Sequence, residues 1–375
     1  MKVILTAARV IVGVLFIFSG LVKANDPLGL SYKMQEFFEV WGMTQFNNYT
    51  LALSVLMIAF EIIAGVAVLL GWRMNLFSWL LLLLIIFFTF LTGYAVLSGK
   101  IRTCGCFGDC IPLTAVQSFC KDLLLTVLIV FIFAFRRRVQ PVFRSTGSVL
   151  ILGLAVFFSF GLQGYVLQHL PLVDCLPYKV GKNILQQMKV PAGALPDSTV
   201  ITFVYEKQGK ETEFTADSFP EDFNDSLYHF KKRYDKVIRE GNAQPPVKDF
   251  VLTTLAGTDS TVAVLQQQGP LLLLFVKDTM NTAMAAPVNE QLRKIMQQAA
   301  DKAIPLYLVT NSREVVGEVA RATGRHPEPF MCDAVAIKTA ARANPALYLL
   351  RNGTIARKWA GADFNQVAGY LAGGQ

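Results

Sequence analysis

Four of the six cysteines in this chain lie close together, in and just after a short segment between two long apolar runs. Cys104, Cys106 and Cys110 fall within seven residues, and Cys120 follows ten residues later. Because only Gly105 separates the first two, a disulfide between them closes a small, constrained ring, which is reduced more readily than a structural disulfide. The residues favour disulfide chemistry if the segment faces an oxidising compartment, and a thiol or metal site if it faces the cytosol.

Three interpretations of this segment follow from the residues. In the first, Cys104 and Cys106 form a reactive dithiol or disulfide, and Lys100 and Arg102 favour the thiolate, which is the nucleophile. In the second, both cysteines are structural and pair separately with other cysteines. In the third, they bind a soft metal, but no histidine lies in the segment and the spacing fits no zinc or iron–sulfur template, so we predict no metal. The candidates for resolving a mixed disulfide, or for structural pairing, are Cys110, Cys120 and Cys175.

The elements that position these cysteines are long apolar segments within the first 170 residues. A helix that crosses a membrane needs roughly 20 apolar residues in succession. The sequence therefore predicts an α-helical membrane bundle of five transmembrane helices, with the lipid bilayer as its surroundings. The predicted spans are about 4–22, 50–71, 75–97, 116–135 and 147–167.

Basic residues orient the predicted bundle. Arg136, Arg137, Arg138 and Arg144 crowd the connection between the fourth and fifth spans, and positive charge near span ends favours the cytoplasm. Counting spans from there places the N-terminus in the cytoplasm, and the cysteine segment and everything after the fifth span outside it. This predicts a multi-pass protein of the bacterial inner membrane with a periplasmic C-terminal domain. The net charge is +8, but no basic patch with interleaved aromatic residues indicates nucleic acid.

Two ionisable residues stand within the predicted spans, Arg9 in the first and Glu61 in the second. Such side chains are costly in a membrane and usually face the bundle interior. Glu61 is a candidate for proton relay or for contact with a quinone, and the alternative is a buried ion pair with Arg9. Since the sequence has no histidine pair placed to ligate haem and no nucleotide-binding loop, no cofactor is evident and a quinone is the candidate electron acceptor.

The composition changes after the fifth span, and we divide the chain accordingly. A connection rich in proline and glycine begins near residue 170, and Pro245 and Pro246 mark a second boundary. Apolar alternation on both sides of Gly209 predicts a β-hairpin between these boundaries, whereas 222–240 has a weak helical period. The predicted units are a transmembrane bundle over 1–170, a connecting region with the hairpin over 171–244, and a C-terminal domain over 245–375.

Strands and helices alternate in the C-terminal unit, which predicts an α/β sheet that contains parallel strands. Arg351-Asn352-Gly353 is a strong hairpin turn between its last two strands. The predicted strands are 270–276, 304–309, 346–350 and 354–359, and the predicted helices are 285–301, 312–323 and 363–372.

The membrane part resembles the MauE/DoxX family of small polytopic membrane proteins over roughly residues 1–135. The Cys-Gly-Cys-Phe-Gly motif indicates the MauE branch, and the fifth span with a large outer domain resembles DoxX-type proteins of Bacteroidota. The family label implies a link to methylamine utilisation, through disulfide-dependent maturation of a dehydrogenase, although the fused tail indicates a different partner. The residues that carry the resemblance are Arg9, Gly13, Phe18-Ser19-Gly20, Lys23, Glu61-Ile62-Ile63-Ala64-Gly65, Leu70-Gly71 and Cys104-Gly105-Cys106-Phe107-Gly108.

The C-terminal unit resembles a thioredoxin-like domain. Residues 246–250 resemble the entry strand, and 344–353 resemble the proline, strand and turn of that fold. Thioredoxins carry Cys-x-x-Cys after the strand that here ends at Val276, but residues 277–284 contain no cysteine. The resemblance therefore implies the fold without thioredoxin chemistry, and Cys332, alone in this unit, is expected to be a core residue.

Together these features predict a membrane-linked thiol–disulfide redox protein. Cys104 and Cys106 exchange electrons with protein thiols in the periplasm, for example those of a redox enzyme under maturation, and electrons pass to a quinone in the bundle near Glu61. One alternative is a non-enzymatic assembly or docking factor, anchored in the membrane, whose redox-inactive thioredoxin fold is the docking module. Another is a DoxX-like subunit of a quinone-linked oxidoreductase.

The predicted topology can be checked by thiol labelling. If the cysteine segment lies outside the cytoplasm, a membrane-impermeant maleimide should label it in intact spheroplasts after reduction. Labelling that appears only after lysis would show that the segment faces the cytoplasm, and would contradict the interpretation based on an oxidising compartment.

Overall fold

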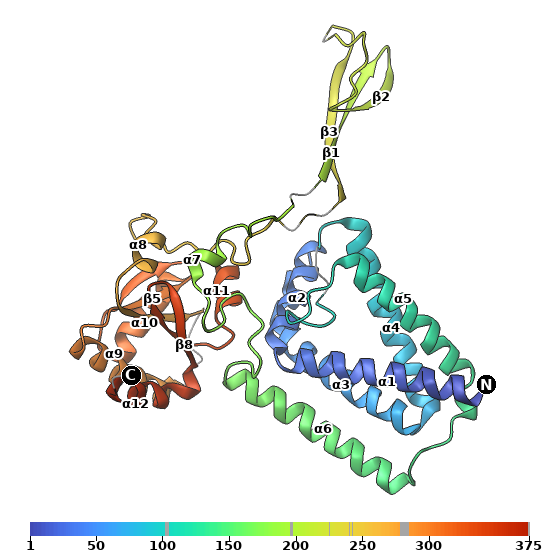
Figure 1. Ribbon diagram of the computed structural model, residues 1–375, viewed down its shortest axis with the longest axis horizontal. Helices are drawn as coiled ribbons and strands as arrows, with labels where there is room; N and C mark the ends of the chain where they lie inside the picture. The colour runs from blue at the N-terminus through green and yellow to red at the C-terminus, as the bar shows by residue number, and fades with distance from the viewer. Residues whose placement is uncertain are drawn as a thin grey trace.

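The computed structural model describes the chain except for residues 102–104, 196–197, 225, 240, 242, 278–284 and 374–375. Its described parts are a bundle of long helices, a projecting three-stranded arm and a domain built on a five-stranded sheet (Figure 1). Cys104 and residues 278–284, which follow the strand ending at Val276, lie outside the described residues.

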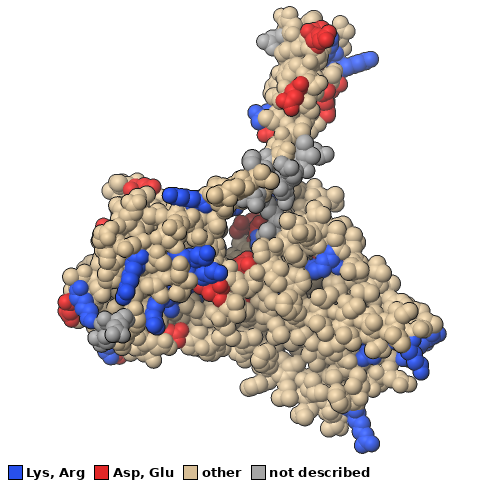
Figure 2. Space-filling view, viewed as in Figure 1, with Lys and Arg blue, Asp and Glu red and all other residues tan. Residues whose placement is uncertain are grey.

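Among the described residues, five helices are long and apolar enough to cross a membrane, which confirms the predicted bundle. Their ends follow local signals: Thr114 and Gln117 form a capping box before the fourth span, and Gly71 ends the second span in a left-handed conformation with φ +67°. Figure 2 shows a wide uncharged surface on this part of the molecule. The spans are α1 (Lys2–Ala24), η1 with α3 (Thr44–Tyr49 and Thr50–Leu70), α4 (Met74–Ser98), α5 (Ala115–Ala134) and α6 (Ser145–Gln168).

The chain between the first two spans forms a further helix, α2 (Pro27–Val40). The Asp26 carboxylate accepts a hydrogen bond from the Gly29 N–H at 3.0 Å, and Pro27 occupies the first turn, so the start of α2 is set by a favourable cap. Ser54 of α3 donates to the Pro27 carbonyl at 2.7 Å. These contacts hold α2 across the end of the bundle that also carries the loop between α4 and α5 (Figure 1).

Glycines allow α1 and α3 to pack backbone against backbone. A Cβ atom on Gly65 would lie 2.8 Å from the carbonyl oxygen of Gly13, and one on Gly20 would lie 2.5 Å from a side chain of α3. Small residues permit such close approach between membrane helices. The consequence for the site is that Lys23, one turn after Gly20, comes within reach of Glu61 on α3.

The arm is a three-stranded antiparallel sheet that projects from the rest of the molecule (Figure 1), with the order β2-β1-β3. Its strands are β1 (Ser198–Lys207), β2 (Lys210–Thr215) and β3 (His229–Arg239). The hairpin of β1 and β2 was predicted from the sequence. The weak helical period over 222–240 was misleading, because 229–239 is a strand. Aromatic packing across the strands decides this, since the Tyr205 ring lies 5.5 Å from Phe230 and 5.2 Å from Phe214.

The C-terminal domain has a five-stranded sheet in the order β6-β5-β4-β7-β8, in which β4, β5 and β6 are parallel and β7 and β8 run antiparallel. A parallel βαβ unit followed by an antiparallel hairpin and a closing helix is the predicted thioredoxin-like arrangement, and the Asn344–Pro345 peptide bond before β7 is cis. The short strand β6 was not predicted. The strands are β4 (Pro270–Val276), β5 (Leu306–Thr310), β6 (Glu328–Met331), β7 (Ala346–Arg351) and β8 (Thr354–Ala360).

Helices cover both faces of this sheet, and the central strand β4 is buried on both sides. Its alternate residues feed two separate cores, with Leu273 in one and Leu274 in the other. The segment after α6 also contributes, because Tyr178 and Ile184 belong to the first core. One face carries α9 (Ala285–Asp301), α10 (Arg313–Thr323) and α12 (Phe364–Gly373), and the other carries α7 (Ile184–Gln187), α8 (Thr261–Leu265) and α11 (Ala334–Ala340).

The thioredoxin-like domain docks on the end of the bundle that carries α2. Arg342, only 5% exposed, pairs with Asp26 at 2.7 Å and with Asp109 of the α4–α5 loop at 2.6 Å. Lys277, directly after β4, donates to the Tyr32 hydroxyl on α2 at 3.1 Å. One pole of the domain is formed by the residues that follow β4 and those that precede β7. This pole therefore faces the loop between α4 and α5, which we call the cysteine loop.

Arg342→Gln should loosen this docking. Removal of a buried cation leaves two carboxylates uncompensated, at a cost on the order of 2 kcal/mol, below the roughly 3–5 kcal/mol of a fully buried pair because Asp109 is 41% exposed. We expect faster amide hydrogen exchange in α2 and in residues 105–114. Arg351→Gln, at an exposed arginine of β7, is the matched control, and unchanged exchange in the Arg342 variant would contradict the role given to this ion pair.

Candidate functional site

The loop between α4 and α5 turns back into the bundle and carries Cys106 with it. Gly105 and Gly108 have φ values of +67° and +58°, which glycine adopts without strain, and the Gly108 N–H donates to the Gly105 carbonyl at 3.0 Å. The Ser19 hydroxyl of α1 lies 3.0 Å from the Cys106 carbonyl oxygen. These bonds hold Cys106 against the ends of the spans, so its thiol faces the bundle and not open solvent.

The groups around the Cys106 thiol are charged or polar. Burial raises the pKa of this thiol, while the positive charges of Lys121 and Lys23 oppose the shift and the carboxylate of Asp122 adds to it. The buried Ser118 hydroxyl, which has no hydrogen-bond partner in the described structure, also acts to lower this pKa. The two cations and the hydroxyl thus partly offset burial, and the pKa of the thiol stays above its ordinary value.

Lys121 is itself held in place by a buried carboxylate. Its ammonium lies 2.6 Å from Asp122 Oδ1, and the Thr92 hydroxyl donates to Asp122 Oδ2 at 3.1 Å. The ammonium also lies 5.3 Å from the centre of the Phe107 ring. These contacts join α4, α5 and the cysteine loop around one ion pair.

The sequence analysis named Lys100 and Arg102 as the cations that favour the thiolate, and this choice was incomplete. Lys100 is exposed at the end of α4 and Arg102 lies outside the described residues, whereas the cations that act on the Cys106 thiol are Lys121 and Lys23. A signal for the first was present, because Lys121 and Asp122 fall inside the fourth predicted span, and ionisable residues within a span usually mark a functional site.

Glu61 forms a buried ion pair with Lys23 and not with Arg9. The two charged groups lie 2.5 Å apart, and the residues expose only 1% and 3% of their side chains. Arg9 instead donates to the backbone carbonyls of Val68 and Leu69, at 3.1 and 3.0 Å near the other end of α3. The alternative of an Arg9–Glu61 pair is wrong, because the two residues lie at different depths in the bundle.

A polar path connects Glu61 to Cys106. The Ser19 hydroxyl lies 3.2 Å from Glu61 Oε2 and 3.0 Å from the Cys106 carbonyl oxygen. A cavity of about 30 Å³ lies beside them, and Lys23 and Lys121 help to line it. Apolar side chains form much of its wall, but its size and the charged groups on the rest of the wall suit a single water molecule, which would allow a proton to pass between the thiol and the carboxylate.

Two of the three candidate resolving cysteines are bonded to each other. Cys110 and Cys175 form a disulfide with a Cα–Cα distance of 4.8 Å, which ties the cysteine loop to the segment after α6. This pairing was not among those predicted, since the structural interpretation paired Cys104 and Cys106 with these cysteines, and it leaves Cys106 with a free thiol. Cys120 is exposed on α5, and Cys332 is buried in the thioredoxin-like core, where desolvation raises its pKa to about 12.

The described residues include no cluster of three or more His, Cys, Asp or Glu side chains arranged to hold a metal ion. The chemistry that this arrangement offers is instead that of a thiol. The sulfur of Cys106 has two cations and a hydroxyl near it.

Comparison with known families identifies the membrane part. Residues 1–135 match the family of the methylamine utilisation protein MauE. The match covers α1 to α5 with the cysteine loop, and confirms the resemblance seen in the sequence. Residues 199–240, which form the arm, match a domain family of unknown function, DUF8463. No curated protein matches the chain.

Two solved structures are similar to the C-terminal part. One is a thiol:disulfide interchange protein from Bacteroides sp., at 15% identity over 34% of this chain and 88% of that chain, with a TM-score of 0.26. The other is a thioredoxin-like protein from Bacteroides caccae, at 18% identity over 34% of this chain and 47% of that chain, with a TM-score of 0.27. The assignment of the fold rests on the strand order described above.

The environment of Cys106 predicts how its reactivity depends on Lys121. Alkylation needs the thiolate, so its rate rises with pH toward a pKa that burial holds above the ordinary value. Lys121→Gln removes a charge that lowers this pKa, and should move the pH profile upward and slow alkylation at neutral pH by ~3- to 10-fold. Rates are followed by mass spectrometry at Cys106.

Lys100→Gln is the matched control, because it removes a lysine of the same loop that is exposed. Its pH profile should stay that of the unmodified chain. Equal shifts in the two variants would show that the general charge of the loop, and not Lys121, sets the reactivity of Cys106.

Proposed function

We propose that this chain is a membrane-linked thiol–disulfide redox protein, and that Cys106 acts together with Cys104. The observation that supports this best is the free Cys106 thiol, held at the end of a membrane bundle beside Lys121 and Lys23. A buried structural cysteine needs no such cations, and the chain does hold one without them, Cys332. The match of residues 1–135 to MauE agrees with a redox role.

The proposed exchange conserves atoms and electrons. A partner thiolate attacks one sulfur of a Cys104–Cys106 disulfide, and the other sulfur leaves as a thiolate. The partner's second thiolate then breaks the mixed disulfide, so that the partner gains a disulfide and the chain keeps two thiols. We assign the leaving thiolate to Cys106, because Lys121 and Lys23 lie where they oppose the effect of burial and meet the charge that develops on its sulfur.

We place this exchange on the periplasmic side of the bacterial inner membrane. The cysteine loop and the thioredoxin-like domain lie at one end of the bundle, and Met1 and Arg138 meet at the other, 3.7 Å apart. The Cys110–Cys175 disulfide suits an oxidising compartment. The partners in this proposal are thiols of proteins in that compartment, for example those of a redox enzyme under maturation.

A second candidate function has its own support. The thioredoxin-like domain has no cysteine in 277–284, and its corresponding pole is occupied by Tyr32 of α2 and by the Arg342 ion pairs. These features also suit a non-enzymatic docking or assembly factor. In that case the domain supports the membrane part, and the loop cysteines are not exchanged.

Serine substitutions separate the two candidates. If the loop is a shuttle, Cys104→Ser and Cys106→Ser should each abolish disulfide transfer to a reduced dithiol protein while membrane abundance stays near normal. Mixed with a partner that keeps one cysteine, activated beforehand as a mixed disulfide with thionitrobenzoate, one of the two variants should form a stable mixed disulfide with the partner. Its remaining thiolate attacks the partner sulfur, thionitrobenzoate leaves as a thiolate, and no neighbouring cysteine resolves the product. The readouts are transfer kinetics and non-reducing electrophoresis.

Cys120→Ser is the matched control, since it removes an exposed cysteine of α5 and should keep full activity. Loss of both loop variants from the membrane would mean that the two cysteines are structural. Normal abundance with unchanged function would support the docking factor.

A further inference from the structure

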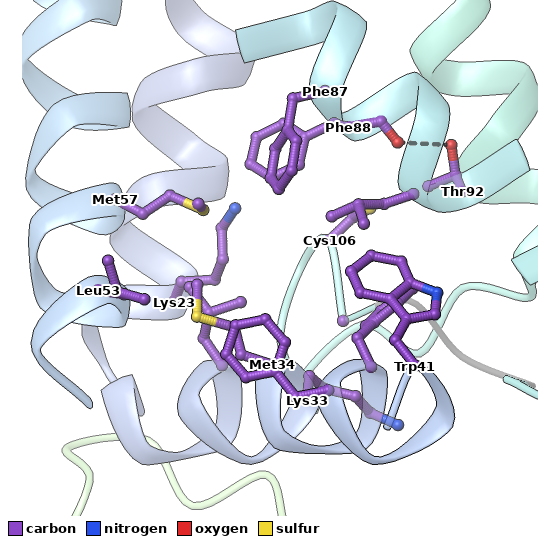
Figure 3. A pocket seen from close by; sticks show the side chains of 15 residues that line it. Lys23, Lys33, Met34, Trp41, Leu53, Met57, Phe87, Phe88, Thr92 and Cys106 are labelled. Carbon is purple, nitrogen blue, oxygen red and sulfur yellow. Dashed lines mark hydrogen bonds between the residues drawn. The ribbon is translucent and has the colours of Figure 1, made fainter. Parts of the chain in front are cut away.

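An apolar cavity of about 220 Å³ lies between α2, α3, α4 and the cysteine loop, and Cys106 forms part of its wall (Figure 3). It is distinct from the small polar cavity near Glu61, although Lys23 borders both. The apolar walls include the rings of Phe37, Phe38, Trp41, Phe87 and Phe88 and the thioether of Met57.

The few polar groups of this cavity gather near the thiol. The Lys23 ammonium, paired with Glu61, lies 5.3 Å from the centre of the Phe88 ring. The hydroxyl oxygen of Thr92 lies 2.9 Å from the Phe88 carbonyl oxygen, as the dashed line in Figure 3 marks, and 3.1 Å from Asp122 Oδ2, so its one proton already faces two acceptors.

Lys33 also lines the cavity, but its ammonium points away from it in Figure 3 and pairs with Glu36 at 2.6 Å. A ligand in this space would therefore meet the Cys106 thiol and the Lys23 ammonium, and otherwise mainly rings and alkyl groups.

We propose that this cavity binds the ring of a membrane-soluble quinone, which accepts the electrons of the loop dithiol; this rests on the proposed function. A volume of 220 Å³ falls below the roughly 300 Å³ at which pockets for drug-sized ligands begin, so it suits a single ring system. Aromatic rings stack on a planar ring. The Lys23 ammonium is a donor suited to a carbonyl oxygen at the ring edge.

The wall also offers a path for an isoprenoid tail. Leu53 of α3 and Phe87 of α4 line the cavity, and both belong to membrane spans while exposing 44% and 43% of their surface. In a bilayer these surfaces meet lipid. A quinone tail can therefore stay among the acyl chains while the ring lies beside Cys106. A phospholipid acyl chain would use the same walls but would give Lys23 no acceptor.

The electron transfer balances without another reactant. The thiols of Cys104 and Cys106 lose two electrons and two protons as an S–S bond forms. The quinone takes up both electrons and both protons and becomes a quinol. Lys23 lies between the cavity and Glu61, so it can pass a proton to one quinone oxygen and recover one from Glu61 and the thiol side.

Binding can be measured without any redox step. Trp41 lines the cavity, so a short-tail ubiquinone added to the purified full chain in nanodiscs should quench its fluorescence in a saturable way. Trp41→Phe should remove that component. The Cys104→Ser/Cys106→Ser double variant should still show it, because the ring does not need the thiols to bind.

Electron transfer is tested in a single turnover. The chain is reduced, freed of reductant and mixed with the same ubiquinone, and quinol formation is followed by absorbance. Met57→Trp fills the cavity and should slow this step at least tenfold while disulfide transfer to a protein dithiol continues. Leu56→Trp, on the neighbouring exposed position of α3 with 59% exposure, should react like the unmodified chain.

The two proposals fail in different ways. If the unmodified chain shows saturable quenching of Trp41 but does not transfer a disulfide to a protein dithiol, the redox function is overturned and the quinone site stands. Normal disulfide transfer without saturable quenching, or with quinol formation that Met57→Trp does not slow, would overturn the quinone site. Quenching that added phospholipid relieves in proportion to its amount would overturn it in favour of a lipid site.

Discussion

The buried ion pair between Lys23 and Glu61 is the constraint on which the membrane part depends. Each charge costs several kcal/mol to remove from water, and only close geometry with further hydrogen bonds offsets that cost. The chain meets the requirement by packing α1 against α3 through Gly20 and Gly65, which brings the two groups to 2.5 Å. The same packing sets the position of Ser19, and Ser19 in turn holds the backbone of Cys106.

The molecule separates the thiol from the fold that usually carries one. The thioredoxin-like domain supplies a rigid sheet with two cores and a basic residue, Arg342, that docks it. The membrane part supplies the thiol and its electrostatic surroundings. The segment that leaves α6 links the two parts. Its Cys175 is bonded to Cys110 of the cysteine loop, and its Asp174 pairs with Lys358 of the thioredoxin-like domain at 2.8 Å.

Much of this architecture could be predicted from the sequence, because it follows from periodicity. Apolar length predicted the five spans, and strand–helix alternation with the turn at Asn352-Gly353 predicted the C-terminal sheet. Local patterns failed where tertiary contacts decide, as in β3, whose charged sequence pairs with β1 through Phe230 and Tyr205. The partner of Glu61 also could not be read from the sequence, since residue types do not give the depth of Arg9 or Lys23 in a bundle.

The docking of the thioredoxin-like domain has a consequence for specificity. A domain tied to the loop by a short covalent connection and a disulfide has an effective concentration in the millimolar range. Any free thioredoxin-like protein that approaches the loop through the same pole must displace this resident domain from Asp26 and Asp109. The fused domain therefore already occupies this approach to the loop.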